Sequence, residues 1–329
     1  MDIGAAVIQA SIRTAIDFIK GNLPKLFQKD GYDESTIERS INDHMTEVVA
    51  WSGRMQSFGM SRGEETDTRT IPLQLREPRQ FRSVRSDLQK NENDLIADPD
   101  HYLLLGNPGA GKTTTLKRIV RQMLLSEGEY ENDTFQCPIV LRLREMSESS
   151  IYIAIANIFG LPYEIRTIHD HSVRARSGHE VVIAGRKIEN VIPEILNAMQ
   201  VVVLVDGLDE IGADHKADTW RVLSKLTLRS VSYKVIVSCR TGDYLQNLEG
   251  FSVVELCPLT AAQIQTIAEQ WVPESQSFIA ALERVPYKDL ADRPLLLNQL
   301  LLFPSAPPQD FRSRRCSRRP SGGRSEVCR

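Results

Sequence analysis

The residues from 106 to 113 read GNPGAGKT and directly follow the apolar run 102–105, so a strand leads into a glycine-rich loop. Glycines permit backbone conformations and close approaches that a Cβ would obstruct, which lets successive N–H groups surround a phosphate. A helix predicted over 112–126 would direct its positive dipole end at the same anion. This GxxxxGKT pattern therefore predicts a binding site for a nucleoside triphosphate, ATP or GTP.

Two side chains of this loop have specific expected roles. Lys112 would reach the β- and γ-phosphates, and the hydroxyl of Thr113 would bind Mg²⁺. The other residues predicted to bind the nucleotide are Gly106, Asn107, Pro108, Gly109, Ala110, Gly111 and Thr114.

An acidic motif further along the chain predicts the second half of the site. The apolar run 201–205 is typical of a parallel strand buried on both faces, and it ends in the sequence DGLDE. A doubly wound sheet binds ligands at the carboxyl ends of its strands, so Asp206 is expected beside the phosphate loop, where it would hold Mg²⁺ through water. Asp209 and Glu210 are both placed to orient or deprotonate the attacking water, and the sequence does not choose between them.

The acidic motif carries a family resemblance. The string LVDGLDEI resembles the NACHT family of STAND-class signalling ATPases, because a small residue follows the Mg²⁺ acid and two further acids come after it. Ordinary AAA+ enzymes usually have Glu in the position that Gly207 occupies here. The resemblance covers roughly residues 70–303.

Two further stretches agree with the resemblance and imply two more site residues. The segment KVIVSCR is similar to the family's sensor strand, which implies that its last residue, Arg240, reads the γ-phosphate. The segment RPLLLNQLLL resembles the first helical subdomain, which implies that Pro294 packs near the adenine.

By resemblance, the protein is an ATP-binding switch that hydrolyses ATP slowly and assembles into a homo-oligomer on activation. The implied cofactors are ATP or ADP with Mg²⁺, the implied place is the cytoplasm, and the implied role is defence signalling, against phage if the source is bacterial. The activating ligand would be an unidentified protein or pathogen molecule. The alternative is a stand-alone P-loop ATPase or phosphotransferase whose substrate binds in the insertion 160–190.

The alternation of apolar runs and helical patterns predicts an α/β fold, a P-loop NTPase with a parallel doubly wound sheet. Strands are expected at 102–106, 137–143, 201–206, 234–239 and 252–256. Helices are expected at 112–126, 148–158, 187–199, 215–230, 261–271, 275–284 and 294–303. Residues 165–185 contain three histidines among arginines without metal-site spacing, and a solvated insertion is expected there.

Five segments are expected along the chain. Residues 1–60 form a helical N-terminal region, with helices over 3–20 and 33–58. The resemblance implies an effector or adaptor at this position, whereas the residues themselves favour a helical docking domain. Residues 61–100 form a linker, with a loop over 59–70 and an extra strand over 70–76. Residues 101–258 form the nucleotide-binding domain, 259–304 the first helical subdomain, and 305–329 a disordered basic tail. The abrupt change of composition in this tail suggests a frame-shifted or truncated end rather than a nucleic-acid-binding segment.

Composition excludes several other classes. A net charge of −3 does not favour nucleic-acid binding, and 41% hydrophobic residues are enough for sizeable cores. The five cysteines form no CxxC pair and no zinc spacing with histidine, so reduced thiols are expected. Charged residues interrupt the apolar stretch near the N-terminus, so neither a signal peptide nor a membrane span is expected.

Overall fold

The computed structural model of the protein describes residues 33–55, 64–78, 89–125, 137–146, 150–169, 177–244 and 248–302, together with the single positions 9, 10, 13, 17 and 21. Apart from those single positions, the helix expected over 3–20 lies outside the described residues, and so does the basic tail 305–329.

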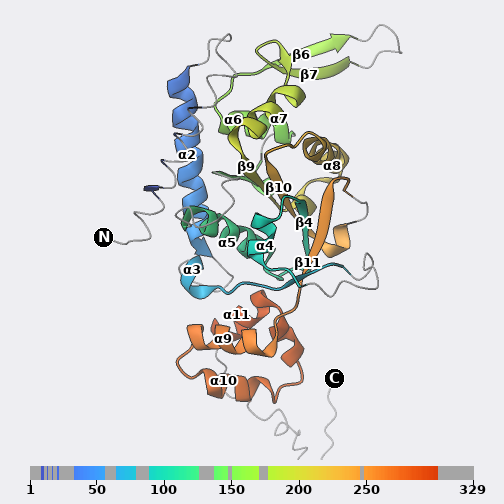
Figure 1. Ribbon diagram of the computed structural model, residues 1–329. Helices are drawn as coiled ribbons and strands as arrows, with labels where there is room; N and C mark the ends of the chain where they lie inside the picture. The colour runs from blue at the N-terminus through green and yellow to red at the C-terminus, as the bar shows by residue number, and fades with distance from the viewer. Residues whose placement is uncertain are drawn as a thin grey trace, which may run out of the picture.

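A six-stranded sheet forms the centre of the molecule (Figure 1). Five strands are parallel: β4 (His101–Gly106), β5 (Cys137–Arg142), β9 (Val201–Asp206), β10 (Lys234–Arg240) and β11 (Phe251–Leu256). They lie in the order β11-β4-β10-β9-β5, and the short strand β3 (Leu75–Arg76) pairs antiparallel with β11 at one edge. The predicted parallel α/β sheet is confirmed, but β10 separates β9 from β4, so the two strands with the site motifs are not adjacent.

Helices cover both faces of this sheet. The helix α5 (Lys112–Leu125) packs against β4, β5, β9 and β10, while α8 (Ala213–Leu228) lies on the opposite side in Figure 1. The helices α6 (Ile151–Ile158) and α7 (Ile188–Met199) connect β5 to β9, and the short α4 (Glu92–Ala97) precedes β4. Because it is covered on both sides, β9 is completely buried from Val201 to Val205, as its unbroken apolar run predicts.

The N-terminal helix α2 (Glu34–Gly53) packs directly on the sheet domain. The side chain of Asp33 caps its first turn, and its apolar stripe of Ile37, Ile41, Met45 and Val48 is buried in the same core as the sheet. Its neighbours are α5, α6 and β5. Whether residues 1–60 form a unit with its own function stays a prediction.

The chain after Gly53 differs both from the helix expected to continue to residue 58 and from the loop expected over 59–70. Within the described residues, β1 (Arg54–Met55) pairs with β2 (Glu64–Glu65), and α3 (Thr66–Arg69) follows at once. The expected loop is wrong for 64–69, where Thr66 is fully buried and Asp67 forms an ion pair with Arg121 of α5. Of the extra strand expected over 70–76, only Leu75–Arg76 forms a strand, β3.

The insertion expected to be solvated contains a three-stranded antiparallel sheet, formed by β6 (Glu164–His169), β7 (Ser177–Ile183) and β8 (Arg186–Lys187). Ala184 and Gly185 connect β7 to β8 with positive φ angles of 49° and 75°, the backbone that a two-residue hairpin requires. Residues 164–167 of β6 are exposed, which agrees with a solvated surface. The sheet lies at the end of the molecule far from β11 (Figure 1).

A helical subdomain follows β11 and lies below the sheet in Figure 1. It consists of α9 (Ala261–Trp271), α10 (Ser275–Leu282) and α11 (Pro294–Leu302), close to the predicted bounds. A capping box between Thr260 and Gln263 begins α9. Among the described residues, no helix combines the length and hydropathy needed to cross a membrane.

Candidate functional site

A cavity of about 400 Å³ opens at the carboxyl edge of the sheet, between the sheet domain and the helical subdomain. The residues that line it come from five separate stretches of the chain: Met55, Pro108, Gly109, Gly111, Lys112, Thr113, Thr114, Asp206, Gly207, Asp209, Glu210, Ser238, Arg240, Pro294, Leu295 and Asn298. The structure thus brings together the two motifs that the sequence singled out and adds the end of β10, which lies between them.

The loop between β4 and α5 depends on two glycines with left-handed backbone. Gly109 and Gly111 have φ angles of 77° and 99°, which residues with a Cβ rarely adopt. A Cβ at Gly109 would lie 2.9 Å from the Cβ of Leu295, and one at Gly111 would lie 2.9 Å from Cδ1 of Leu73. The loop therefore requires glycine for its conformation and for the close approach of its neighbours.

Lys112 begins α5 and bends back over the loop. Its Nζ donates to the carbonyl of Gly106 at 2.8 Å and to that of Asn107 at 3.4 Å. Burial lowers the pKa of Lys112, while the nearby carboxylate of Asp209 opposes that shift. A partly desolvated ammonium that is satisfied mainly by neutral carbonyls is well suited to accept an anionic ligand.

The predicted metal ligands lie side by side. The hydroxyl of Thr113 lies 2.9 Å from Oδ2 of Asp206, and the hydroxyl of Ser238 donates to Oδ1 of Asp206 at 2.7 Å. Ser238 also accepts a hydrogen bond from the backbone N–H of Gly207 at 2.9 Å, so it fixes the end of β9. One hydroxyl and one carboxylate suit Mg²⁺, which takes few protein oxygens and keeps several waters. In the parts of the chain that the structure describes, no cluster of three His, Cys, Asp or Glu side chains offers a site for another metal.

The two acids after Asp206 have different surroundings. The side chain of Asp209 is almost fully buried and is bound twice by Arg240: Nε lies 2.8 Å from Oδ2, and the backbone N–H donates to Oδ1 at 3.0 Å. Glu210 is exposed and lines the cavity, and within the described residues its carboxylate has no ion-pair or hydrogen-bond partner. Arg240 remains about half exposed, with 47% of its side-chain surface accessible.

The start of α11 closes the cavity from the helical subdomain. Pro294 is the first residue of that helix, a position that suits its missing N–H. The backbone N–H of Leu295 donates to the carbonyl of Gly109 at 3.2 Å, which ties the subdomain to the phosphate loop. Pro294 and Leu73 both approach Gly111, so apolar side chains gather at this end of the cavity.

Most of the predicted site residues line the cavity, while three support it from behind. Gly106, Asn107 and Ala110 are not among the lining residues; the first two supply the carbonyls that bind Lys112, and Ala110 packs against the core. Sequence reasoning missed five lining residues: Met55, Gly207, Ser238, Leu295 and Asn298. A serine near the end of a strand, or a methionine far upstream of the motifs, carries no pattern that would have identified it.

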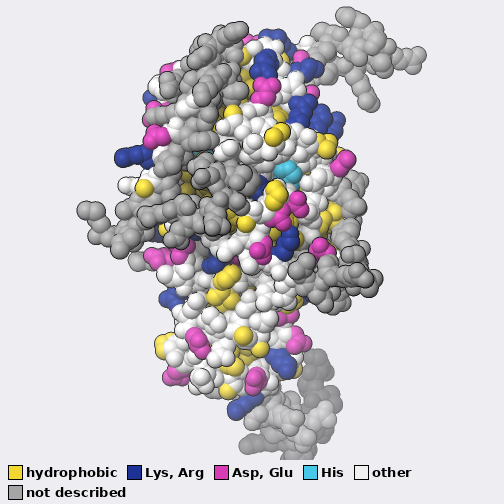
Figure 2. Space-filling view, viewed as in Figure 1, with side chains coloured by type: hydrophobic (Ala, Val, Ile, Leu, Met, Phe, Trp, Pro, Cys, Tyr) yellow, Lys and Arg dark blue, Asp and Glu magenta, His cyan; other side chains and the backbone are white. Residues whose placement is uncertain are grey.

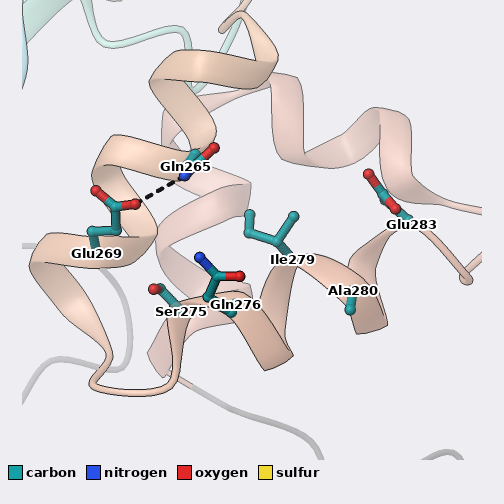
Figure 3. A pocket seen from close by; sticks show the side chains of 7 residues that line it. All are labelled: Gln265, Glu269, Ser275, Gln276, Ile279, Ala280 and Glu283. Atoms are coloured by element: carbon teal, nitrogen blue, oxygen red, sulfur yellow. Dashed lines mark hydrogen bonds between the residues drawn. The ribbon is translucent and has the colours of Figure 1, made fainter.

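A second hollow of about 210 Å³ lies between α9 and α10 (Figure 3). Its side chains are neutral or acidic, and Gln265 donates to Glu269 across one helical turn at 3.0 Å. The acidic Glu283 lies toward its other end, and no lysine or arginine lines it. This hollow therefore lacks the cations that a phosphate ligand needs, in contrast to the cavity at the sheet edge.

The sheet order, the glycine loop and the acids at the strand ends define a P-loop NTPase. The chain belongs to the NACHT family, because the NACHT domain model matches residues 100–275, more than half of its 329 residues. A comparison with curated proteins gave no match.

A comparison with solved structures found several of low similarity. A STAND protein with a tetratricopeptide repeat sensor, PH0952 from Pyrococcus horikoshii, is 16% identical with a TM-score of 0.38 and covers 64% of this chain. The RuvB protein of Thermotoga maritima is 16% identical with a TM-score of 0.33 over 61% of this chain. The ORC1 protein of Aeropyrum pernix, solved in complex with DNA, is 17% identical with a TM-score of 0.40 over 70%. This chain spans 28%, 53% and 63% of those proteins, less than two thirds of each.

Proposed function

We propose that this protein binds ATP with Mg²⁺ in the cavity at the carboxyl edge of the sheet and hydrolyses it slowly, as a nucleotide-dependent signalling switch. The observation that carries the proposal is the convergence of Lys112, Thr113, Asp206 and Arg240 on one cavity at the mouth of the glycine loop. Membership of the NACHT family supports the same proposal.

The polyphosphate would lie along the loop, with its negative charge compensated by backbone N–H groups and by Lys112. Thr113 and Asp206 would hold Mg²⁺, which when bound withdraws charge from the phosphates. Ser238 would keep the carboxylate of Asp206 oriented, since its hydroxyl is already bound to that carboxylate at 2.7 Å. Pro294 would contact the adenine at the apolar end of the cavity.

The surroundings of the two acids favour different roles for them. Glu210 would orient and deprotonate the attacking water. Its side chain is exposed at the cavity, and within the described residues it forms no ion pair. Asp209 would act as a positioning residue for Arg240, which it binds through both carboxylate oxygens. Arg240 would then stabilise the negative charge that develops on the γ-phosphate.

Switch behaviour requires that ATP and ADP favour different states of the protein. The contact between Leu295 and Gly109 supports such a switch, because it couples the phosphate loop to the helical subdomain. The proposal also includes homo-oligomerisation on activation, an unidentified protein or pathogen ligand, a cytoplasmic location, and a role in defence signalling, against phage if the source is bacterial. These four parts rest on the family alone.

The alternative, a P-loop enzyme with its substrate in the insertion 160–190, has no comparable support. None of the residues that line the cavity belongs to β6, β7 or β8. A transferase would need its acceptor within reach of the γ-phosphate.

Titration calorimetry with Mg²⁺ and ATP or ADP tests the binding step, and mass photometry of the same samples tests assembly. We expect saturable binding of both nucleotides and a larger assembly with ATP. Absence of binding by folded protein would overturn the proposal. Rapid, continuous turnover by a monomer would instead favour the alternative enzyme.

A further inference from the structure

The N-terminal part of the chain contributes a side chain to the nucleotide cavity. Met55, at the end of β1, lines the cavity together with Thr113 and Asp206, and only 7% of its surface is exposed. Met55 lies well before the matched NACHT segment, which begins at residue 100. One side chain that lines the cavity therefore comes from a segment that precedes the matched domain.

Lys117 holds this segment in place. It lies one helical turn after Thr113 on α5, and its Nζ donates to the carbonyl of Arg54 at 2.5 Å. The same ammonium lies 5.2 Å from the centre of the Trp51 ring, a cation–π distance. Burial lowers the pKa of Lys117, and the nearby carboxylate of Asp206 opposes that shift. Arg54 is the C-cap of α2, so Lys117 binds that helix at the end where a cation is favoured.

The position of Lys117 also shows which end of the cavity Met55 faces. Thr113 and Lys117 share one face of α5, and Lys117 interacts electrostatically with Asp206. Met55 follows the carbonyl that Lys117 binds, so it lies at the end with the proposed metal ligands. Pro294, the proposed adenine contact, comes from the helical subdomain instead.

The thioether of Met55 at this end would make different contacts with ATP and with ADP. It offers no cation to a phosphate, but it can pack against a bound group and exclude water from it. The γ-phosphate is the part of the ligand that would reach this end, so a displacement of Met55 would depend on whether that phosphate is present. Because four buried apolar side chains fix α2 to the core, a displacement at its C-terminal end is transmitted to the helix.

We propose that Met55 contacts the triphosphate end of the bound nucleotide, that Lys117 positions it, and that α2 thereby senses which nucleotide the cavity holds. This inference rests on the proposed nucleotide site. Coupling of this kind is reciprocal, so a protein partner that binds α2 would change the affinity for ATP by the same factor by which ATP changes the affinity for the partner.

Hydrogen–deuterium exchange of the full chain tests the inference, with Mg²⁺ and either ADP or a non-hydrolysable ATP analogue at saturation. We expect the amides of residues 49–55 to exchange at least about fivefold more slowly with the ATP analogue than with ADP. A factor of about five is at the low end of the range for typical allosteric coupling. Calorimetry on the same sample establishes that nucleotide is bound. A parent protein that binds no nucleotide would refute the proposed function itself, whereas bound nucleotide without this difference would refute only the inference.

Three variants separate positioning from general structure. Lys117→Met keeps an apolar stem over Trp51 but loses the donor to Arg54, so we expect it to lose the difference between the two nucleotides. Lys117→Arg restores a donor and should recover the difference. Lys225→Met is the matched control, because Lys225 pairs with Glu189 on α7 and lines neither cavity.

Met55→Ala provides an independent test if Lys117→Met does not fold by circular dichroism. Shortening the side chain should reduce the difference in exchange while the hydrogen bond of Lys117 remains. If the difference persists unchanged in Met55→Ala or in folded Lys117→Met, the proposed contact is refuted.

Discussion

The two edges of the central sheet use similar charged residues in opposite ways. At the carboxyl edge, Lys112, Asp206 and Arg240 surround a cavity of about 400 Å³. At the amino edge, Lys90 and Lys234 lie on the ring of Tyr102, with Nζ atoms 4.9 and 5.1 Å from its centre. No residue of this second group lines either described cavity.

The difference lies in how the charges are satisfied. At the amino edge, Asp98 accepts hydrogen bonds from Lys90 at 3.0 Å and from the hydroxyl of Tyr102 at 2.6 Å, and its backbone carbonyl accepts one from Lys234. At the carboxyl edge, Arg240 is half exposed and Glu210 has no described partner. Buried charge is costly unless paired, so the closed cluster acts on stability, whereas the open one has capacity left for a ligand. The predictions below test this division.

Figure 2 shows both acidic and basic side chains on the face that it presents, in line with the net charge of −3. Electrostatic attraction of a nucleotide should therefore depend on the local cations at the carboxyl edge rather than on the charge of the whole molecule.

The largest expected effect is that of Lys112→Ala on nucleotide binding. Loss of a charged donor to the phosphates should weaken binding by about 3 kcal/mol, or roughly 100-fold in Kd. Its pKa is already lowered by burial, so its removal should leave the thermal midpoint close to that of the parent. Calorimetry and thermal unfolding measure the two quantities. Unchanged affinity would show that the loop is not the nucleotide site.

Substitution of the two acids should affect hydrolysis rather than binding. Glu210→Gln should slow turnover by about 100-fold or more if Glu210 is the general base. Asp209→Asn should have a smaller effect, since it weakens the ion pair with Arg240 but keeps the side-chain volume. Phosphate release at saturating ATP, with Kd determined in parallel, checks both variants. A larger loss in Asp209→Asn than in Glu210→Gln would reverse the proposed roles.

The sequence predicts those parts of the site that depend on local patterns of residues, and not those that depend on contacts between distant segments. The apolar runs of β4 and β9 and the loop between β4 and α5 were recognisable because burial on both faces and phosphate binding each restrict residue types locally. The order of the strands is not local, so the insertion of β10 between β4 and β9 was not foreseen, and neither was the role of Ser238. The contribution of Met55 to the cavity could not be predicted from the sequence for the same reason, because it depends on packing between distant segments.

The sheet β6–β8 was missed for a different reason. Its strands have exposed faces and no strong alternation of apolar and polar residues, and its turn uses Ala184-Gly185 rather than the more familiar Asn-Gly. The assignment of roles to the acids also required structure. Two neighbouring carboxylates are equivalent as sequence, but only one of them is bound by Arg240.

His101 at the amino edge should make the protein sensitive to acid. Its Nδ1 accepts the backbone N–H of Val235 at 3.0 Å, and burial lowers the pKa of His101 to about 4, with a further contribution from Lys234. The unfolded chain takes up this proton near pH 6.5, so stability should fall as the pH drops from 6.5 toward 4. The expected loss at pH 5 is about 1 to 2 kcal/mol.

Urea unfolding at pH 7 and pH 5 measures this loss, and His101→Asn is the matched variant because its amide oxygen can replace Nδ1 as acceptor. Burial also lowers the pKa of His44 to about 4, so His44 contributes to the loss of stability over the same pH range. The contribution of His101 is therefore the difference between parent and variant. An equal loss of stability in both would show that His101 does not titrate as described.

Lys234 should produce the smallest effect on stability. Its effect should be a gain in stability as the pH rises above 8, whereas that of His101 is a loss as the pH falls below 6.5. It is fully buried, and burial lowers its pKa to about 8, while the carboxylates of Asp98 and Asp100 oppose the shift. In the unfolded chain the proton leaves only near pH 10.4, so between pH 8 and 10 the unfolded state binds more protons and stability rises with pH. From pH 8 to pH 9 the expected gain is about 1 kcal/mol.

Lys234→Met should remove this gain, because the thioether cannot titrate, and it should leave the affinity for ATP unchanged. Urea unfolding at pH 8 and 9 and calorimetry at pH 8 test the two statements together. If Lys234→Met weakens nucleotide binding as Lys112→Ala does, the two edges are coupled through β10 and β4, and the division between a structural edge and a binding edge is wrong. If only the pH dependence disappears, the buried lysine affects folding alone, as its closed surroundings predict.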